Sequence, residues 1–328
     1  MDISEFDLIE SCFAPLSIGY DEAYALKNDA ALISEHPDRS TVVTMDTLIA
    51  GVHFFITDPA EDIARKCLRV NLSDLAAMGA EAFAYTLSMA YNENIDGQWV
   101  KSFTSGLAAD QKLFSIHLIG GDTVKTPGPL TITVTCFGHV PRHHCLKRNT
   151  ALPGQDIWVS GTLGDAAAGL KILNGDANSS NSEFRQNLIK RFRVPQPRTE
   201  LGCYLLKESI SNTAMDVSDG LLADLTHITS ASKVGATIQE KDLPFSNAFN
   251  SLMSENKDLK TKLAVAGGDD YELLFTADRN QRDKIIALSR TLSIKLTRIG
   301  IVEKGEEVSL LREDGSLFQI TNLGWKHF

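Results

Sequence analysis

The sequence predicts a mixed α/β protein (α+β mixed) built of two α/β domains. Its 328 residues, 43% hydrophobic and 23% charged, are enough for two domains at roughly 150 residues per domain. Strand-like and helix-like patterns are interleaved through both halves of the chain. Between Pro141 and Gly154 the composition shifts and the periodicity is lost, so we place the domains at residues 1–140 and 150–328.

In the first half, apolar residues at helical spacing predict helices at residues 5–14, 59–79 and 99–114. Pro59 suits the first turn of its helix, and Gly79 suits the end. Runs of β-branched or alternating residues predict strands at residues 42–47, 83–90, 116–119 and 130–135. We expect residues 15–27 to form a loop.

In the second half, similar patterns predict strands at residues 157–160 and 271–275 and a helix of small residues through Leu170. Another helix follows Gly220, because Leu221, Leu225 and Ile228 share one face. Residues 175–182 are expected to form a surface loop, and residues 193–198 an extended segment that proline stiffens.

Charge and composition exclude several classes of protein. A net charge of −10 argues against binding nucleic acid through its phosphates, which requires a basic face. The five cysteines are scattered, without the spacing of a zinc site or a disulfide framework. Since no signal sequence and no run of about 18 apolar residues is found, we expect a cytoplasmic protein that neither binds nor spans a membrane. Such an acidic chain can still bind ATP if divalent cations offset the repulsion.

Asp74 is the first candidate for chemistry. It lies at the end of the predicted helix at residues 59–79, where Asn71, Asp74 and Met78 share a face with apolar residues. A buried carboxylate needs a cation, a metal ion or strong hydrogen bonds. The alternative is that Asp74 is an ordinary solvated acid at the surface.

Further aspartates fall just after predicted strands or at helix starts, namely Asp29, Asp46, Asp122, Asp216 and Asp219. Each alone is as well explained as a cap or turn residue. Together they indicate a set of ligands for Mg²⁺, which binds polyphosphates in phosphoryl-transfer enzymes. Paired glycines beside acids, at 120–122 and 267–269, would let backbone amides approach an anion. The segment 161–164 is a weaker candidate of this kind, and a strand-to-helix turn explains it better.

Six motifs together resemble the thiamine-monophosphate kinase family, in order and over nearly the whole chain. They are the segments at residues 45–54, 71–80, 119–123, 216–221, 267–273 and 324–328. The blocks around Asp74 and Asp122 resemble, more loosely, the wider superfamily of aminoimidazole ribonucleotide synthetase, selenophosphate synthetase and a hydrogenase-maturation protein. The blocks at residues 46–54, 267–273 and 324–328 are more particular to the kinase.

The resemblance implies an ATP-dependent kinase that transfers the γ-phosphoryl group directly to thiamine monophosphate, the final step of thiamine diphosphate biosynthesis. It implies that catalysis depends on Asp46, Asp74, Asp122 and Asp219, and that several Mg²⁺ ions are held by Asp29, Thr44, Met45, Asp46, Asp74, Asp122, Asp216 and Asp219. Gly121, Asp122, Arg148 and Ser218 would contact ATP, and His53, Asp269 and Trp325 would contact thiamine monophosphate. The implied fold is a homodimer whose N-terminal domains contribute strands to a dimer-spanning β-barrel, with the active site between the domains.

The chain departs from the family pattern at Asn28, where an aspartate is usual, and at Met45, where a serine or threonine is common. An amide oxygen or a backbone carbonyl can still bind a cation, so we expect activity with altered metal affinity. The alternatives are another ATP-using synthetase of the same superfamily, or a nucleotide-binding relative without catalytic activity. Asp269, in place of the commoner glutamate, is a milder change.

Overall fold

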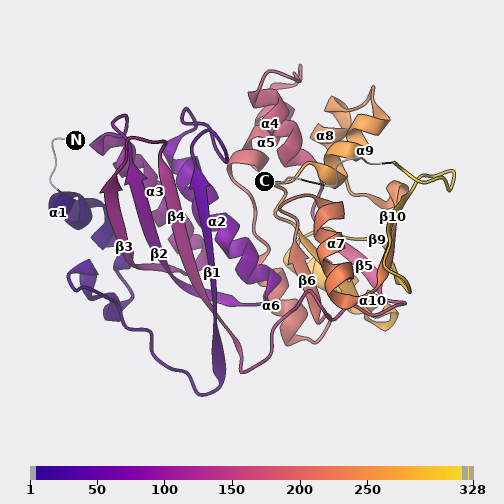
Figure 1. Cartoon of the computed structure of the whole chain (residues 1–328), viewed down its shortest axis with the longest axis horizontal. Helices are drawn as coiled ribbons and strands as arrows, with labels where there is room; N and C mark the ends of the chain where they lie inside the picture. The colour runs from indigo at the N-terminus through magenta and orange to yellow at the C-terminus, as the bar shows by residue number, and fades with distance from the viewer. Residues whose placement is uncertain (1–4, 320–323, 325–328) are drawn as a thin grey trace. The chain divides into compact units, whose positions relative to one another are not determined.

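The computed structural model describes residues 5–319 and residue 324 (Figure 1). The chain separates into two compact units. Unit 1 comprises Met1–Leu75 and Ala80–His144, and unit 2 comprises Ala76–Gly79 and Cys145–Phe328. Each unit contains a β-sheet with helices packed against it, so the expected mixed α/β class is confirmed.

Unit 1 is a sheet of four strands in the order β1-β4-β2-β3 among the described residues. Strand β3 runs parallel to β2, whereas β4 is antiparallel to both β1 and β2. Helices α2 and α3 lie on one face of this sheet (Figure 1). The elements are α1 (Glu5–Leu8), β1 (Arg39–Ile49), α2 (Ala60–Ala77), β2 (Glu81–Tyr91), α3 (Gly97–Phe114), β3 (His117–Lys125) and β4 (Thr131–Pro141).

The first segment of unit 1 differs from the expected helix and loop. The α-helical turns of α1 give way to a π-helical turn at Ile9–Phe13, and 3-10 turns follow at Ala14–Ser17 and Asp21–Leu26. The predicted single helix at residues 5–14 and the irregular loop at 15–27 were therefore only partly right. Pro15, which has no N–H to donate, lies in the first of these 3-10 turns and prevents the helix from continuing through it.

Strand β3 continues past the point where the sequence pattern ends. The expected strand stops at Ile119, but β3 includes Gly120, Gly121 and Asp122 because this segment pairs in parallel with β2. A Cβ atom at Gly121 would lie 2.1 Å from the carbonyl oxygen of Leu87. Glycine is therefore needed here for the close approach of two strands, which is a different reason from the anion contact that the sequence suggested.

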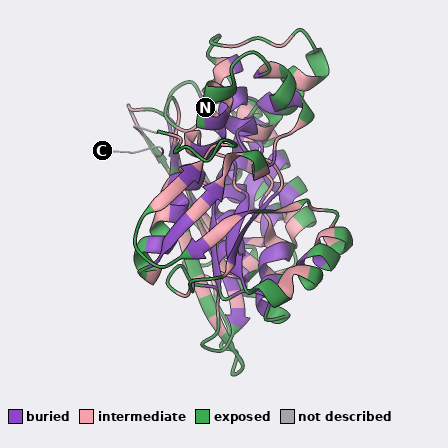
Figure 2. Ribbon diagram, turned by 90° about the vertical axis from the view of Figure 1, so that its right-hand side faces the viewer, coloured by how far each residue is buried: buried purple, intermediate pink, exposed green. Residues whose placement is uncertain are grey.

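Burial alternates from residue to residue along β1 of unit 1; Figure 2 colours the ribbon by burial. On β1, Val43 and Met45 are 57% and 64% exposed, whereas Thr44 and Asp46 point to the more buried face. This alternation follows from the period of two along a strand. It sends Thr44 and Asp46 toward the side that α2 covers.

Arg69 of α2 and Asp110 of α3 form a buried ion pair. Arg69 Nε lies 2.6 Å from Asp110 Oδ2, and Arg69 Nη2 lies 2.8 Å from Oδ1, so the contact is bidentate. The two residues are 5% and 1% exposed. Arg69 therefore neutralises the buried carboxylate of Asp110.

Unit 2 is built on a six-stranded sheet, within the described residues, in the order β10-β7-β9-β5-β8-β6. Its elements are β5 (Asp156–Ser160), α4 (Asp165–Leu173), α5 (Ser182–Arg193), α6 (Thr199–Lys207), β6 (Thr213–Asp216), α7 (Leu221–Ser232), β7 (Gly235–Gln239), α8 (Asn247–Leu252), α9 (Lys257–Ala266), β8 (Leu273–Ala277), α10 (Arg282–Leu292), β9 (Leu296–Glu303) and β10 (Val308–Leu311). Short 3-10 turns occupy Glu240–Asp242 and Arg279–Gln281. Leu221, Leu225 and Ile228 of α7 all lie in the hydrophobic core, as their spacing predicted.

The strand expected at residues 271–275 begins two residues later, at Leu273. Tyr271 has φ 50°, which is incompatible with a strand, so the chain turns sharply before β8 begins. No helix in the described ranges, 5–319 with residue 324, has the length and hydropathy needed to span a membrane.

We predict that Asp110→Ala destabilises the protein, because it leaves the Arg69 guanidinium buried without a counter-charge. The expected loss is about 3–5 kcal/mol in the free energy of unfolding. The matched control is Lys101→Ala, an exposed position on the same helix, with an expected change within about 0.5 kcal/mol. Urea denaturation followed by circular dichroism measures both, and equal stability of the two variants would contradict the prediction.

Candidate active site

Asp46 of β1 and Asp74 of α2 are held close together in unit 1. Thr44, two residues before Asp46 on the same face of β1, donates a hydrogen bond from Oγ1 to Asp74 Oδ2 at 2.5 Å. Burial and the neighbouring Asp74 carboxylate raise the pKa of Asp46 to about 6. Asp74 itself is half-buried. It is therefore a partly buried, hydrogen-bonded acid and not a solvated one.

The pairing of Asp46 with Asp74 sets the chemistry of this part of the site. Two carboxylates about 4 Å apart repel by ~1 kcal/mol in water and by ~4 kcal/mol at an effective dielectric of 20. A divalent cation removes that repulsion, and oxygen atoms are the ligands that Mg²⁺ prefers. This donor set of two carboxylates and the Thr44 hydroxyl therefore fits a divalent cation.

Met45 and His53 are placed differently by β1 and the turn after it. The Met45 side chain lies on the face of β1 opposite Asp46, so only its backbone carbonyl is available to a cation there. His53 follows the tight turn after Ile49 and accepts the Ile49 N–H at Nδ1, 3.0 Å away. In the neutral ring this leaves the proton on Nε2.

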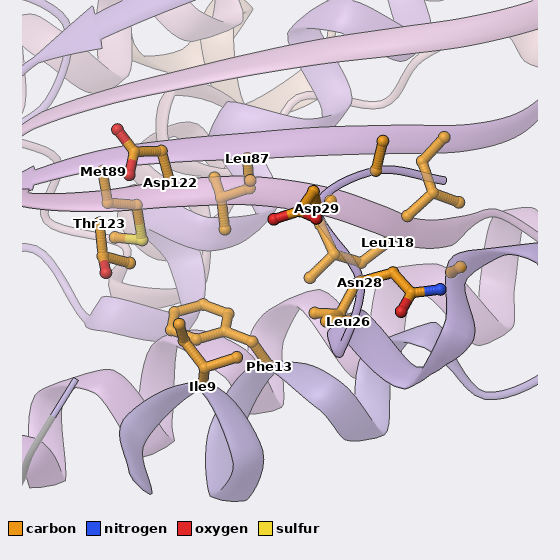
Figure 3. Close-up of a pocket in the computed structure, with 15 residues that line it drawn as sticks. Ile9, Phe13, Leu26, Asn28, Asp29, Leu87, Met89, Leu118, Asp122 and Thr123 are labelled. Carbon is orange, nitrogen blue, oxygen red and sulfur yellow. The ribbon is translucent and has the colours of Figure 1, made fainter. Parts of the chain in front are cut away.

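A pocket in unit 1 brings three more of the expected residues together, Asp29, Gly121 and Asp122. Asp29, Asn28, Gly121 and Asp122 line it, along with the apolar side chains of Ile9, Phe13, Leu26, Leu87, Met89 and Leu118. Figure 3 shows Ile9 and Phe13 rising from the first helical segment toward the side where Asp29 and Asp122 lie. The pocket therefore has an apolar floor beside two exposed carboxylates.

In unit 2, the segment 216–220 lies against the segment 267–272. Three backbone hydrogen bonds of 2.8 Å join them: Val217 N–H to the Glu272 carbonyl, Asp269 N–H to the Ser218 carbonyl, and Tyr271 N–H to the Val217 carbonyl. Asp269 has φ 61°, a conformation that costs a non-glycine residue about 1 kcal/mol or more. The hydrogen bonds to 216–220 offset this cost and fix Asp269 beside Ser218.

Asp216 and Asp219 flank Ser218 and lie near a third acid, Asp224. Asp216 is the last residue of β6 and is 2% exposed, while Asp219 is half-buried. The N-cap of α7 is Gly220, so neither Asp216 nor Asp219 is a cap of that helix. Burial and the carboxylates of Asp216 and Asp219 raise the pKa of Asp224 to about 8, against the opposing effect of backbone N–H groups.

Glu272 anchors the 267–272 segment from inside unit 2. Its carboxylate is fully buried and receives hydrogen bonds from Arg198, from Arg191 at 2.9 Å and from Ser160 Oγ at 2.6 Å. Burial alone would raise the pKa of Glu272, but the two guanidinium groups and Ser160 outweigh it and hold the pKa below its ordinary value. This cluster fixes the end of the segment that carries Asp269.

The segment 161–164 is a strand-to-helix turn, as the sequence favoured. A Cβ atom at Gly161 would lie 2.1 Å from Glu272 Oε1, so glycine is required by the buried carboxylate. At the start of α4, Asp270 Oδ2 accepts the Gly164 N–H at 2.8 Å. A side chain of this chain thus occupies the position that a phosphate would need.

The described part of the chain contains no group of three or more His, Cys, Asp or Glu side chains close enough together to hold a metal ion. The acids of unit 1 instead form the pair Asp46–Asp74 and the pocket pair Asp29–Asp122. The metal and catalytic roles expected for these residues therefore stay predictions.

Comparison with known proteins identifies the family. Residues 27–140 match the family described as AIR synthase related protein, N-terminal domain, and residues 153–312 match its C-terminal domain. The chain is 37% identical to thiamine-monophosphate kinase of Escherichia coli K12, over 100% of this chain and 99% of that protein. It is 36% identical to the enzyme of Caulobacter vibrioides, over 99% of this chain and 91% of that protein. The chain belongs to the thiamine-monophosphate kinase family.

Solved structures of this family have the same fold. Thiamine-monophosphate kinase from Stenotrophomonas maltophilia superposes with a TM-score of 0.81 at 42% identity, covering 89% of this chain and 90% of that one. A complex of AaThiL with AMPPCP and TMP superposes with a TM-score of 0.79 at 30% identity, covering 92% and 91%. The hydrogenase maturation protein HypE, at 17% identity and a TM-score of 0.78, covers 99% of both chains and shares the fold.

The expected ATP contact Arg148 lies at the opposite end of α7 from Ser218. The Arg148 carbonyl accepts a hydrogen bond from Ser232 Oγ at the end of α7, whereas Ser218 precedes the start of that helix. At 1.5 Å per residue, the 12 residues of α7 span about 18 Å. Trp325 lies outside the described residues.

Sequence reasoning missed Asp224, Asp270 and the cluster around Glu272. Asp224 had a signal, because it is an acid four residues after the glycine that precedes an apolar helix. Asp270 and Glu272 belong to a motif that was noticed, but their partners Gly164, Arg191 and Arg198 are 74 or more residues away. No local pattern marks such partners.

We predict that Glu272→Gln lowers the free energy of unfolding at neutral pH by about 3–5 kcal/mol, because Arg191 and Arg198 lose their buried counter-charge. Since the pKa of Glu272 is depressed, its contribution is present above the ordinary glutamate pKa and is lost as pH falls through the folded-state pKa. The stability gap between wild type and Glu272→Gln should therefore narrow in acid, as measured by chemical denaturation at several pH values.

The control for this prediction is Asp258→Asn, which removes an exposed ion pair with Arg312. Because this pair is exposed, its loss should lower the free energy of unfolding far less than Glu272→Gln does. The prediction would be contradicted if the free energies of unfolding of wild type and Glu272→Gln differ little at neutral pH, or if their difference grows in acid.

Proposed function

We propose that this protein is an ATP- and Mg²⁺-dependent kinase that phosphorylates thiamine monophosphate to thiamine diphosphate, the final step of thiamine diphosphate biosynthesis. The observation that carries the proposal is identity of 33–37% to thiamine-monophosphate kinases over 99–100% of this chain. Transfer is direct, with the acceptor phosphate attacking the γ-phosphorus of ATP in line and ADP leaving. No phosphoenzyme intermediate forms.

The arrangement of acids in unit 1 supports this proposal. Thr44, Asp46 and Asp74 offer oxygen atoms on one face of β1 and the facing side of α2. Asp29 and Asp122 offer two more beside the pocket, and Met45 can add only its backbone carbonyl. Mg²⁺ held by these residues would neutralise phosphate oxygens as charge shifts from ATP to the acceptor.

In unit 2, Asp216 and Asp219 are the proposed metal-binding acids, and Ser218 between them is a proposed ATP contact. The backbone hydrogen bonds to 267–272 hold these residues rigidly, which supports positioning as their main contribution. Arg148 and Gly121 are the other proposed ATP contacts. Arg148 is exposed, so its long side chain is available to a phosphate group.

The acceptor contacts are proposed to be His53, Asp269 and Trp325. His53 is held by the Ile49 N–H with its other ring nitrogen protonated, which suits donation to a phosphate oxygen. Asp269 is fixed by its bond to Ser218, next to the proposed ATP contact. The chain needs no strong general base, because the attacking group is already an anionic phosphate.

We also propose that the protein is a cytoplasmic homodimer. Strands of the two N-terminal domains would pair in a β-barrel that spans both subunits. The outer face of β1 supports an interface, because Val43 and Met45 are 57% and 64% exposed there. Exposed apolar side chains grouped on a sheet face are more often covered by a partner than left in water.

The decisive experiment offers the purified protein ATP, Mg²⁺ and thiamine monophosphate and detects thiamine diphosphate and ADP. We predict that Asp74→Asn reduces turnover by about 100-fold or more with the fold unchanged, because the variant loses half of the carboxylate pair that stabilises phosphate charge through a cation. Glu61→Gln, an exposed acid on the same helix, should leave turnover unchanged.

The outcomes separate the proposal from its alternatives. Consumption of a purine-pathway amide in place of thiamine monophosphate would identify another synthetase of the superfamily. Binding of ATP·Mg²⁺ without turnover of any acceptor would identify a non-catalytic relative. Wild-type turnover in Asp74→Asn would contradict the metal-binding role of the Asp46–Asp74 pair.

We also predict that Asn28→Asp lowers the Mg²⁺ concentration needed for half-maximal activity by several-fold. Asn28 lines the pocket beside Asp29 and Asp122, so a carboxylate there adds a charged ligand where the chain now has a neutral amide. The same change at the exposed Asn94 adds equal charge elsewhere and should leave the Mg²⁺ requirement unaltered. An unchanged requirement in Asn28→Asp would show that the pocket acids are not metal ligands.

A further inference from the structure

Asp224 holds the backbone of the 218–220 segment through a single carboxylate oxygen. The N–H groups of Ser218, Asp219 and Gly220 all donate to Asp224 Oδ2, at 3.0, 3.2 and 3.1 Å. Three consecutive N–H groups aimed at one oxygen form a concave anion-binding turn, here filled by a side chain of the protein itself. The carboxylate reaches back from the first turn of α7 to the residues before it.

Other parts of unit 2 also hold the 218–220 segment. On its other side, Val217 and Ser218 are bonded to the 267–272 segment. Gly220 has φ 128°, and a Cβ atom there would lie 2.9 Å from Ala266 Cα. The segment is thus fixed between α9 with the 267–272 segment on one side and Asp224 on the other.

Asp224 is too deeply buried to touch a substrate. Its side chain is 0% exposed, and Oδ1 is buried with no hydrogen-bond partner among the described residues. A buried acid that leaves one oxygen unpaired is costly. This cost is offset at Oδ2, which accepts hydrogen bonds from three N–H groups that would otherwise have no partner.

We propose that Asp224 is a positioning residue that sets the conformation of Ser218 and Asp219 for binding ATP·Mg²⁺. This inference rests on the proposed function, since Ser218 and Asp219 are the residues assigned there to ATP and Mg²⁺. Asp224 acts through them, and it touches neither substrate nor metal. What matters is an acceptor oxygen at Oδ2, whatever the charge of the group that carries it.

The test measures binding of a non-hydrolysable ATP analogue with Mg²⁺ by calorimetry, which needs no acceptor and no turnover. In Asp224→Ala the three N–H groups lose their partner, and the Kd of the analogue should rise by about 10-fold or more. Asp224→Asn keeps an acceptor oxygen and places its NH₂ group at the unpaired Oδ1 position. Its Kd should stay within about 3-fold of wild type.

Two further variants separate an effect on the position of residues 218–220 from an effect on the stability of the protein. Leu225→Ala removes packing from the neighbouring, fully buried residue of α7 and should lower the melting temperature while leaving the Kd unchanged. Asp224→Leu has a similar branched shape without the acceptor, and it replaces Asp224→Ala if that variant does not fold. Hydrogen exchange of the amides of residues 218–220 should accelerate in Asp224→Ala or Asp224→Leu and not in Leu225→Ala.

The proposal is overturned if the acceptor-free variant binds the analogue as wild type does, or if Asp224→Asn is as impaired as that variant. It is also overturned if Leu225→Ala weakens binding to the same degree. Failure of the proposed function has a separate signature, because wild type would then bind the analogue and leave thiamine monophosphate unphosphorylated.

Discussion

Mutual repulsion of carboxylates is the constraint on which the candidate active site depends. The chain places acids next to acids in both units, and donors of the protein hold several of them in place. Thr44 donates to Asp74, backbone N–H groups donate to Asp224, and two arginines surround Glu272. Burial, together with the neighbouring Asp74 carboxylate, leaves Asp46 with a raised pKa, so a cation beside it would be favoured.

The acids of unit 2 have different roles. Glu272 and Asp270 are turned inward and stabilise the turn from which Asp269 projects, whereas Asp216 and Asp219 lie beside Ser218 on the adjoining segment. Hydrogen bonds between the two segments make them one rigid piece. A substitution at Glu272 therefore also affects the position of Asp269, although the two side chains have different roles.

The sequence alone was sufficient to predict those elements and site segments that leave a local pattern of residues. The β-branched run in β1, the alternation along β4 and the helical spacing along α2, α3 and α7 predicted these elements correctly. Helix α5 was not recognised, although Phe184, Leu188 and Phe192 recur at helical spacing and give this charged helix one apolar face. The extension of β3 through Gly121 and the partners of Glu272 depend on contacts with distant segments, which one sequence does not display.

Strand β1 carries two surfaces on one backbone: Thr44 and Asp46 on the side of α2, Val43 and Met45 on the other. Because the faces alternate residue by residue, inserting or deleting a single residue ahead of Val43 while the pairing with β4 is kept would exchange them. The aspartate would then face outward and the methionine inward. Substitutions in β1 therefore change one side chain at a time, whereas a change of length upstream of Asp46 exchanges the two faces. Homologous chains should accept length variation only in the loop before the strand.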